Sequence, residues 1–226
     1  MKKWRVINIG IPLFFEALQY QDCEAVQIDW RTPVRRSSKM EVLLERINAI
    51  DGDFIIRFMS SHPKDAGKEL IDTIIRCEKI GKHFHLPVQS GSNDILEKMN
   101  RRYTVERYME TIKYARSIIP DFSFTTDIIV GFPGETDEEF ENTIEGIKRV
   151  GFYEVHTFKY SKRKWTKAAK MENQVDGNIA NIRSEKVITL ASKLKNDYMK
   201  KYLGRKMDVL FELYEDCLLY TSDAAD

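Results

Sequence analysis

Short apolar runs and amphipathic helical patterns alternate along the first 160 residues, and no other feature of the sequence limits the fold as strongly. The runs that predict β-strands cover residues 5–10, 25–30, 54–59, 83–88, 122–130 and 153–160. The segments that predict helices cover residues 13–19, 40–50, 68–78, 93–99 and 105–119, and a further helix begins at Thr136. Such alternation is typical of an α/β fold with a parallel sheet. An open doubly wound sheet and a barrel both fit, and both place their sites at the carboxyl ends of the strands.

Local signals mark several helix ends. Thr104 is a candidate N-cap and Pro120 stops the helix that follows it, while Thr136 and Glu139 fit a capping box. In the helix over 40–50 we expect Val42, Leu43, Ile47 and Ile50 to form the apolar face. A long helix is predicted over about 178–203, with Gly204 as its C-cap, and a strand over 206–213.

Composition excludes few classes of protein. The net charge is +1, from 36 basic and 35 acidic residues, so no global basic field indicates nucleic acid, although a local patch could still bind it. No apolar run approaches the length of a membrane span, and the N-terminus lacks the apolar region of an export signal. Cys23, Cys77 and Cys217 are widely spaced and form no metal-binding cluster. We therefore expect a reduced, cytoplasmic setting, no membrane and a monomer.

The segment HLPVQSGSND, residues 85–94, places polar side chains where a strand ends. Gln89, Ser90 and Ser92 offer amide and hydroxyl groups, and Gly91 permits close backbone approach. Such a strand end can hydrogen-bond a ribose or an amino-acid headgroup. The alternative, favoured by spacing alone, is a turn whose Ser and Asn residues cap the next helix.

The segment TTDIIVGFPGETDEEFE, residues 125–141, is a second polar strand end. Gly131 and Gly134 permit close approach of a flat group, and Pro133 fixes the turn. The free N–H groups of the following helix favour an anion or carboxylate, and Glu135 can accept from an amine or a hydroxyl. The alternative is a tight turn before a well-capped helix. The segment is neither a G-x-G-x-x-G fingerprint nor a phosphate-binding loop.

Two further groups of residues fit either a binding site or a purely structural role. His83 and His85 share one strand face and could form half of a metal site, but no third ligand of suitable spacing is visible, so structural histidines and no metal are expected. Arg101 and Arg102 could hold a carboxylate or phosphate, or be a solvated helix end.

The segment KYSKRKWTKAAK, residues 159–170, interleaves basic and aromatic residues. Such a segment suits RNA through phosphate contacts and base stacking, and a flexible solvated loop is an equal alternative. The RNA interpretation assigns contacts to Lys159, Lys162, Arg163, Lys164 and Trp165.

Four segments in order, FIIRFMSSHPKD, HFHLPVQSGSNDILEKMNRRYT, TTDIIVGFPGETDEEFENT and HTFKYSKRKWTKAAKMENQV, resemble the radical S-adenosylmethionine methylthiotransferases. The resemblance runs from about Met40 to Asp216. It is nearest to the MiaB type, which adds a methylthio group to C2 of N6-isopentenyladenosine next to the tRNA anticodon. The wording of the motifs is closer to this branch than to the branch that modifies a ribosomal protein.

The resemblance implies an α/β fold: a partial (βα)6 barrel, related to half of a TIM barrel, followed by a truncated TRAM-like β-barrel. It implies S-adenosylmethionine and 4Fe–4S clusters as cofactors and tRNA as partner. The residues that would line the S-adenosylmethionine cleft are Gln89, Ser90, Asp127, Gly131, Gly134 and Glu135, with Arg101 at the carboxylate; the glycines would leave room for adenosine. Catalytic residues are not assigned.

The sequence also departs from the family pattern. The Cys-x-x-x-Cys-x-x-Cys cluster motif is absent, and the loop RKWTKA lacks the Pro-Gly-Thr-Pro of many relatives. Residues 4–32 resemble the start of FdrA-type proteins, and the last ten residues resemble a translated sequencing adapter. We therefore expect a foreign segment over 1–39, a partial barrel over 40–203, a truncated TRAM-like start over 204–216 and an artefactual tail over 217–226.

Three hypotheses follow. The first is a fragment of a tRNA methylthiotransferase, poorly stable and inactive as written, because a partial barrel leaves sheet edges uncovered and iron–sulfur clusters need thiolate ligands. The second is a non-catalytic RNA- or nucleotide-binding α/β protein. The third, a ligase-like nucleotide-binding protein, follows only the N-terminal resemblance and ranks last.

Overall fold

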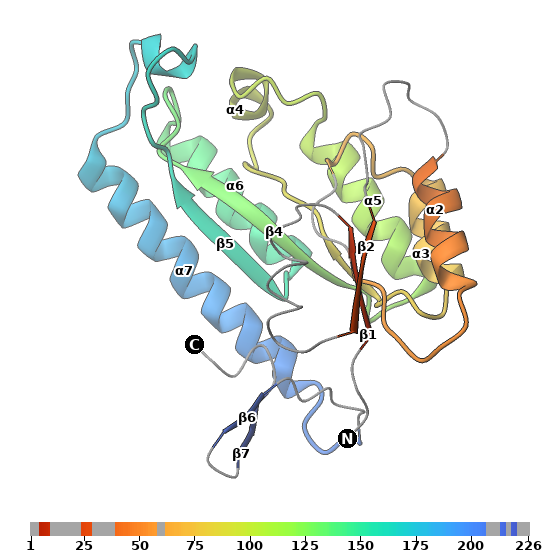
Figure 1. Cartoon of the computed structure of the whole chain (residues 1–226). Coiled ribbons are helices and arrows are strands. Elements are labelled where there is room, and N and C mark those ends of the chain that lie inside the picture. The colour runs from red at the N-terminus through yellow and green to blue at the C-terminus, as the bar shows by residue number, and fades with distance from the viewer. Residues whose placement is uncertain are drawn as a thin grey trace. The chain divides into compact units, whose positions relative to one another are not determined.

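A three-stranded parallel sheet, in the order β3-β4-β5, organises the part of the chain that carries the polar strand ends (Figure 1). The computed structural model describes the backbone of residues 5–9, 24–28, 39–57, 62–206, 213–215 and 218–220, and the side chains of 40–57 and 62–206. The chain divides into two compact units, Met1–Lys39 and Met40–Asp226.

In the first unit, β1 (Arg5–Ile9) and β2 (Glu24–Ile28) pair in parallel, which confirms both predicted strands. The helix predicted over 13–19 lies outside the described residues. The second unit contains α2 (Lys39–Asn48), α3 (Lys68–Arg76), β3 (His83–His85), α4 (Asn93–Lys98), α5 (Val105–Ile118), β4 (Ser123–Val130), α6 (Asp137–Val150), β5 (Glu154–Lys159), a short 3-10 helix (Ala168–Lys170), α7 (Gly177–Lys200), β6 (Leu213–Glu215) and β7 (Leu218–Tyr220).

The sheet has one apolar face and one polar face because side chains alternate along each strand. Phe84 pairs with Phe124 across β3 and β4, and Ile128 with Thr157 across β4 and β5. On the apolar face Phe84, Phe124 and Ile128 are fully buried in the core. In Figure 1, α6 lies behind β4 and β5, and α7 runs along β5. The opposite face carries a set of polar side chains: His83, His85, Thr125, Asp127, Glu154 and His156.

The helix signals of the sequence are confirmed where they are local. The Thr104 hydroxyl caps α5 by accepting from the Arg107 N–H, and Thr136 and Glu139 form the predicted capping box of α6. The predicted end of α7 is wrong. The helix ends at Lys200 with Lys201 as its C-cap, and Gly204, at φ +77°, lies in the turn that follows.

Three other predictions, on the apolar face of α2 and on two strands, are wrong or fall partly outside the described residues. In α2, Leu44 and Ile47 are buried whereas Val42 and Ile50 are exposed. The apolar face that the helix packs against the core is therefore narrower than we predicted. The strand predicted over 54–59 is reduced to one bridge between Ile56 and Ile80, with 58–61 outside the described residues. The strand over 206–213 also lies mostly outside them; β6 and β7 form an antiparallel pair.

Candidate functional site

The turn after β4 is a tight loop that brings a carboxylate back onto its own backbone. Gly131 and Gly134 have φ of +73° and +82°, which glycine adopts without steric cost. The Glu135 carboxylate accepts a hydrogen bond of 2.7 Å from the Gly131 N–H, and only 5% of Glu135 is exposed. The sequence TTDIIVGFPGET therefore folds into a closed turn with a buried acid at its end.

Arg183 of α7, which the sequence analysis missed, completes this turn. Its guanidinium donates to the Glu135 Oε2 at 2.8 Å, to the Glu135 carbonyl at 3.0 Å and to Asp137 Oδ1 at 2.7 Å. Burial raises the pKa of Glu135, and the Gly131 N–H and Arg183 oppose that shift. A signal existed: Arg183 falls on the same helical stripe as the buried Ala180 and Val187, and a charge on an apolar stripe implies a buried partner.

The glycines of this turn are used for packing within the chain. A Cβ on Gly131 would lie 2.7 Å from the Cβ of Ala180, and one on Gly134 would lie 3.2 Å from Lys98 Nζ. Close packing against α7 is therefore one reason for glycine at position 131, and the room that it would leave for an adenosine stays a prediction. What the turn still offers a ligand is its backbone and the carboxylate of Glu135.

The polar residues that follow β3 make hydrogen bonds to other parts of the fold. The Ser90 hydroxyl is fully buried and lies 3.4 Å from the Thr143 hydroxyl of α6. Ser92 caps α4 by accepting from the Ile95 N–H, which confirms the capping alternative for that residue. Gln89 has φ of +70° and bridges to β4 through its own N–H and carbonyl, bonded to Asp127 and Ile129.

Five buried polar side-chain atoms lack a hydrogen-bond partner among the described residues. They are Arg101 Nε, Glu135 Oε1, the hydroxyls of Thr157 and Tyr160, and Arg183 Nε. Tyr160 follows β5, and its ring meets that of Phe132 edge-on at 5.3 Å. A buried donor or acceptor without a partner is costly, so atoms of this kind point to a missing ligand or solvent molecule.

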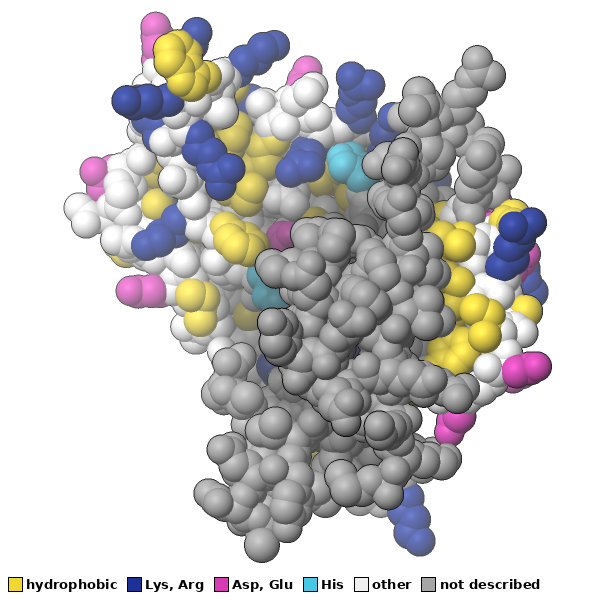
Figure 2. Space-filling view, in the orientation of Figure 1, with side chains coloured by type: hydrophobic (Ala, Val, Ile, Leu, Met, Phe, Trp, Pro, Cys, Tyr) yellow, Lys and Arg dark blue, Asp and Glu magenta, His cyan; other side chains and the backbone are white. Residues whose placement is uncertain are grey.

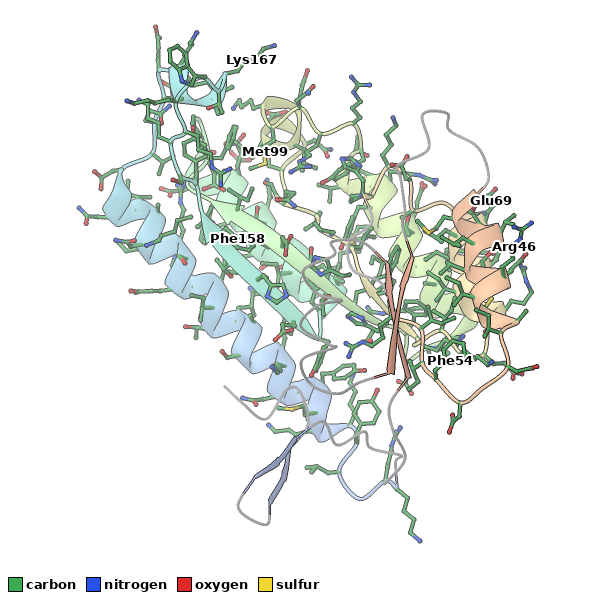
Figure 3. All side chains as sticks on the ribbon, viewed as in Figure 1. Arg46, Phe54, Glu69, Met99, Phe158 and Lys167 are labelled. Atoms are coloured by element: carbon green, nitrogen blue, oxygen red, sulfur yellow. The ribbon has the colours of Figure 1, made fainter. Side chains whose placement is uncertain are left out.

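The basic loop after β5 is a separate feature of the same edge. Residues 161–167 are exposed, and Trp165 is 93% exposed with φ of +73°. Lys159 is partly engaged, since its Nζ donates to Asn181 Oδ1 at 2.9 Å. Figure 2 shows Lys and Arg side chains gathered over the end of the molecule where Figure 1 places this loop. The label of Lys167 in Figure 3 marks the same loop.

The histidines of β3 have partners that sequence spacing could not reveal. His83 Nε2 and His85 Nδ1 lie 3.1 and 2.9 Å from the Thr125 hydroxyl, so both are held by β4. A set of three possible ligands lies together in space and includes His85 but not His83: His85, Asp127 and His156 each offer an atom within 4.8 Å of the others. Parallel pairing of β3, β4 and β5 brings these distant residues together.

Comparison with known proteins now decides the family. The model of the radical SAM superfamily matches residues 34–147, half of the chain. The chain belongs to the radical SAM superfamily. The fold agrees: coproporphyrinogen III oxidase (HemN) from Escherichia coli, a radical SAM enzyme, aligns with 59% of this chain and 31% of its own at a TM-score of 0.50 and 17% identity.

Curated relatives match the same part of the chain with much higher identity. The enzyme named tRNA-2-methylthio-N(6)-dimethylallyladenosine synthase from Thermoanaerobacter pseudethanolicus is 50% identical over 170 residues, which are 75% of this chain and 36% of the relative. Its namesake from Alkaliphilus oremlandii is 45% identical over 170 residues, with the same coverage. The chain thus spans about a third of the length of these relatives.

Radical SAM proteins use S-adenosylmethionine and a 4Fe–4S cluster, and this chain fits the two cofactors unequally. The partnerless Arg101 Nε and Glu135 Oε1 suit a carboxylate and an amine or hydroxyl, so the strand ends fit S-adenosylmethionine. The sequence has only Cys23, Cys77 and Cys217. Cys77 is 3% exposed in the core, and burial raises the pKa of its thiol. The residues present therefore do not fit a cluster, which needs accessible thiolates.

Proposed function

We propose that this chain is a catalytic-barrel part of a tRNA methylthiotransferase that acts at C2 of N6-isopentenyladenosine next to the anticodon. The observation that carries the proposal is the 45–50% identity over 170 residues to enzymes named for that reaction. The activity is that of the full-length relatives, of which the matched part is about a third. In this proposal the partial barrel contributes the strand ends that bind a ligand, and it carries out no reaction step that requires an iron–sulfur cluster.

In this proposal the strand ends hold S-adenosylmethionine. Arg101 pairs with the methionine carboxylate through its partnerless Nε, and the free oxygen of Glu135 accepts from the ammonium group or a ribose hydroxyl. Gln89 and the backbone at Ser90, Asp127, Gly131 and Gly134 frame the adenosine. When bound, S-adenosylmethionine supplies the sulfonium-linked methyl and adenosyl groups on which this chemistry depends.

The basic loop contacts tRNA. Lys162, Arg163 and Lys164 are exposed and free to neutralise phosphates, and Lys159 lies at the start of the same segment. Trp165 presents almost its whole ring to solvent, as a base-stacking residue does.

A binding experiment on the chain itself tests this proposal. We expect calorimetry to detect S-adenosylmethionine binding that falls at least tenfold in Arg101→Met. Lys113→Met, an exposed change on α5, should leave the affinity unchanged. Equal affinity in both variants, or no binding to the wild-type chain, would remove these strand ends from the proposal.

The cysteine content favours a second candidate, a non-catalytic RNA- or nucleotide-binding protein. Three dispersed cysteines do not make a cluster site, whereas the basic loop needs no cluster. The two candidates differ in one measurement: only the first predicts that the matched segment is part of a gene whose product methylthiolates tRNA. Sequencing single long molecules of source DNA across codons 30–45 and beyond codon 216 would distinguish them.

The remaining expectations stay proposals. No helix in the described part of the chain has the length and apolarity that a membrane span requires. We propose a cytoplasmic location and a monomeric state, as suits an enzyme that acts on tRNA. Sedimentation of the purified chain checks the second point.

A further inference from the structure

A cluster of two imidazoles and a carboxylate lies on the polar face of the sheet. His85 comes from β3, Asp127 from β4 and His156 from β5, and one ligand atom of each lies within 4.8 Å of the others. His85 is the last residue of β3, and Asp127 and His156 precede the last residues of β4 and β5 by three positions. The Gln89 N–H donates to the Asp127 carbonyl at 2.9 Å, so the cluster adjoins the strand ends proposed for S-adenosylmethionine, and its ligand atoms belong to side chains that the proposed site does not use.

The distances suit a small cation better than they suit a hydrogen bond. His85 Nε2 and Asp127 Oδ1 are 3.5 Å apart, which is longer than an N–H···O bond of about 2.7–3.2 Å. Two ligands of a tetrahedral zinc ion with bonds of about 2.0–2.1 Å lie about 3.3 Å apart. A ring nitrogen of His156 lies within 4.8 Å of the other two ligand atoms, and its side chain is 45% exposed.

A threonine behind the cluster orients the buried histidine. The Thr125 hydroxyl lies 2.9 Å from His85 Nδ1, and a hydroxyl can accept from that N–H. In the tautomer with the proton on Nδ1, the lone pair of Nε2 is directed at Asp127. A histidine that ligates a metal commonly donates its other N–H to such an oxygen. In that tautomer a cation between Nε2 and the Asp127 carboxylate would remove the repulsion between the lone pair and the carboxylate.

A second carboxylate borders the cluster. Glu154 Oε2 lies 4.0 Å from His156 Nε2, while its other oxygen is held by Lys195 of α7 at 3.1 Å. The three ligands therefore have a second carboxylate beside them, and Lys195 pairs with its other oxygen. Oxygen and imidazole ligands together favour zinc, iron(II), cobalt or nickel over calcium and magnesium.

We propose that His85, Asp127 and His156 bind one divalent transition-metal ion, with Thr125 positioning His85. Each of the three strands contributes one ligand, so the ion links β3, β4 and β5 across the polar face. The proposal rests on this geometry alone and does not depend on the tRNA-modifying function.

Titration of the full chain with Zn²⁺ or Co²⁺ tests the proposal. The chain carries Cys23→Ser and Cys217→Ser, so that these thiolates do not bind the metal, and is first treated with a chelator. We expect one Co²⁺ per chain, with a visible absorption spectrum free of thiolate bands, and an unfolding temperature that rises with metal concentration. Affinity should fall at least a hundredfold in His156→Phe and Asp127→Asn, and about tenfold in Thr125→Val.

A matched control removes a histidine elsewhere. His62 lies outside the cluster and packs edge-on against Tyr103, so His62→Gln should bind metal like the parent chain. His156→Phe changes a largely exposed residue of the edge strand β5, and circular dichroism checks that it stays folded. Binding that is absent in the parent, or unchanged in His156→Phe, overturns the proposal and leaves an imidazole–carboxylate pair. Loss in the cluster variants with retention in His62→Gln supports it.

Discussion

At the scale of single residues, the pair of Glu135 and Arg183 shows how a motif residue can serve the fold and a ligand at once. One carboxylate oxygen takes both the Gly131 N–H and the guanidinium, while the other has no partner among the described residues. The sequence marked Glu135 because it follows two glycines at a strand end. It could not reveal Arg183, since the partner lies 48 positions away on another helix.

We predict that Arg183→Met lowers the free energy of unfolding by about 3 kcal/mol. Removing one member of a buried ion pair leaves the other charge buried without compensation, which costs more than the pair itself contributes. Urea unfolding followed by circular dichroism measures the change. Asp137→Asn is the matched control: that carboxylate is 96% exposed, so losing its ion pair with Arg183 should cost under about 1 kcal/mol.

The double variant Arg183→Met with Glu135→Gln sharpens this test. If the cost arises from a stranded charge, neutralising Glu135 should recover a substantial part of the lost stability, and the two changes should be far from additive. Strict additivity would mean that Arg183 stabilises the chain by packing against Phe140 rather than by pairing with Glu135; its guanidinium lies 5.4 Å from the centre of that ring.

At the scale of elements, the sequence predicted what local chemistry determines and missed what distant packing determines. The predicted N-caps at Thr104 and Thr136 are confirmed because the groups that form an N-cap lie within four residues of each other in the sequence. The strand over 54–59 reduces to a bridge at Ile56, since strand formation depends on a partner that periodicity does not show. The role of Gly91 was assigned to a ligand, yet its contacts are with a helix more than fifty residues further on.

The loop after β3 rests directly on α6, and we predict that Gly91→Ala destabilises the chain by about 3 kcal/mol. A Cβ at this position would lie 2.5 Å from Thr143 Cα and 2.6 Å from the Asn142 carbonyl oxygen. These are backbone atoms that cannot turn aside, so the loop or the helix must shift. Thermal unfolding of the purified variant measures the effect.

Gly146→Ala is the matched control on the same helix. It lies inside α6, and a Cβ there meets nothing within 4 Å. Alanine favours the helix over glycine by about 1 kcal/mol, so this variant should gain stability. A loss in Gly146→Ala, or no loss in Gly91→Ala, would mean that α6 and the loop do not lie as the structure has them.

In the basic loop, Trp165 adopts a backbone conformation that suits glycine. We predict that Trp165→Gly raises stability by up to about 1 kcal/mol, because the left-handed conformation at φ +73° no longer carries a side chain. Affinity for an anticodon stem-loop should fall about tenfold, since a stacking ring is lost. Fluorescence anisotropy at fixed salt measures the second effect.

Trp165→Ala separates the two contributions of this residue. Alanine removes the ring and keeps the unfavourable conformation, so RNA affinity should fall without a gain in stability. If both variants bind RNA like the parent, Trp165 does not stack on a base, and the loop is a solvated segment.

At the scale of the whole molecule, the division of the sheet into an apolar and a polar face explains which parts of the prediction succeeded. The parallel α/β class followed from alternation and is confirmed by the order β3-β4-β5 and by the match to the radical SAM superfamily. The polar face was not predicted as a unit, because its members come from three strands spread over residues 83–156. His85, Asp127 and His156 lie within the segments quoted for the family resemblance, but those segments do not show that strand pairing places the three side chains together.

The cysteines are dispersed over the whole chain. We therefore predict that reconstitution with iron and sulfide under reducing conditions yields no 4Fe–4S cluster on this chain. A cluster needs several thiolates around one point. Cys77 is buried among core residues, and Cys23 and Cys217 are 194 positions apart in the sequence. Iron and sulfide analysis with Mössbauer spectroscopy measures the outcome, and a relative carrying the Cys-x-x-x-Cys-x-x-Cys motif is the positive control. About four iron and four sulfide per chain would show that other residues replace the thiolates, and the binding of S-adenosylmethionine at these strand ends would then have to be reconsidered together with that cluster.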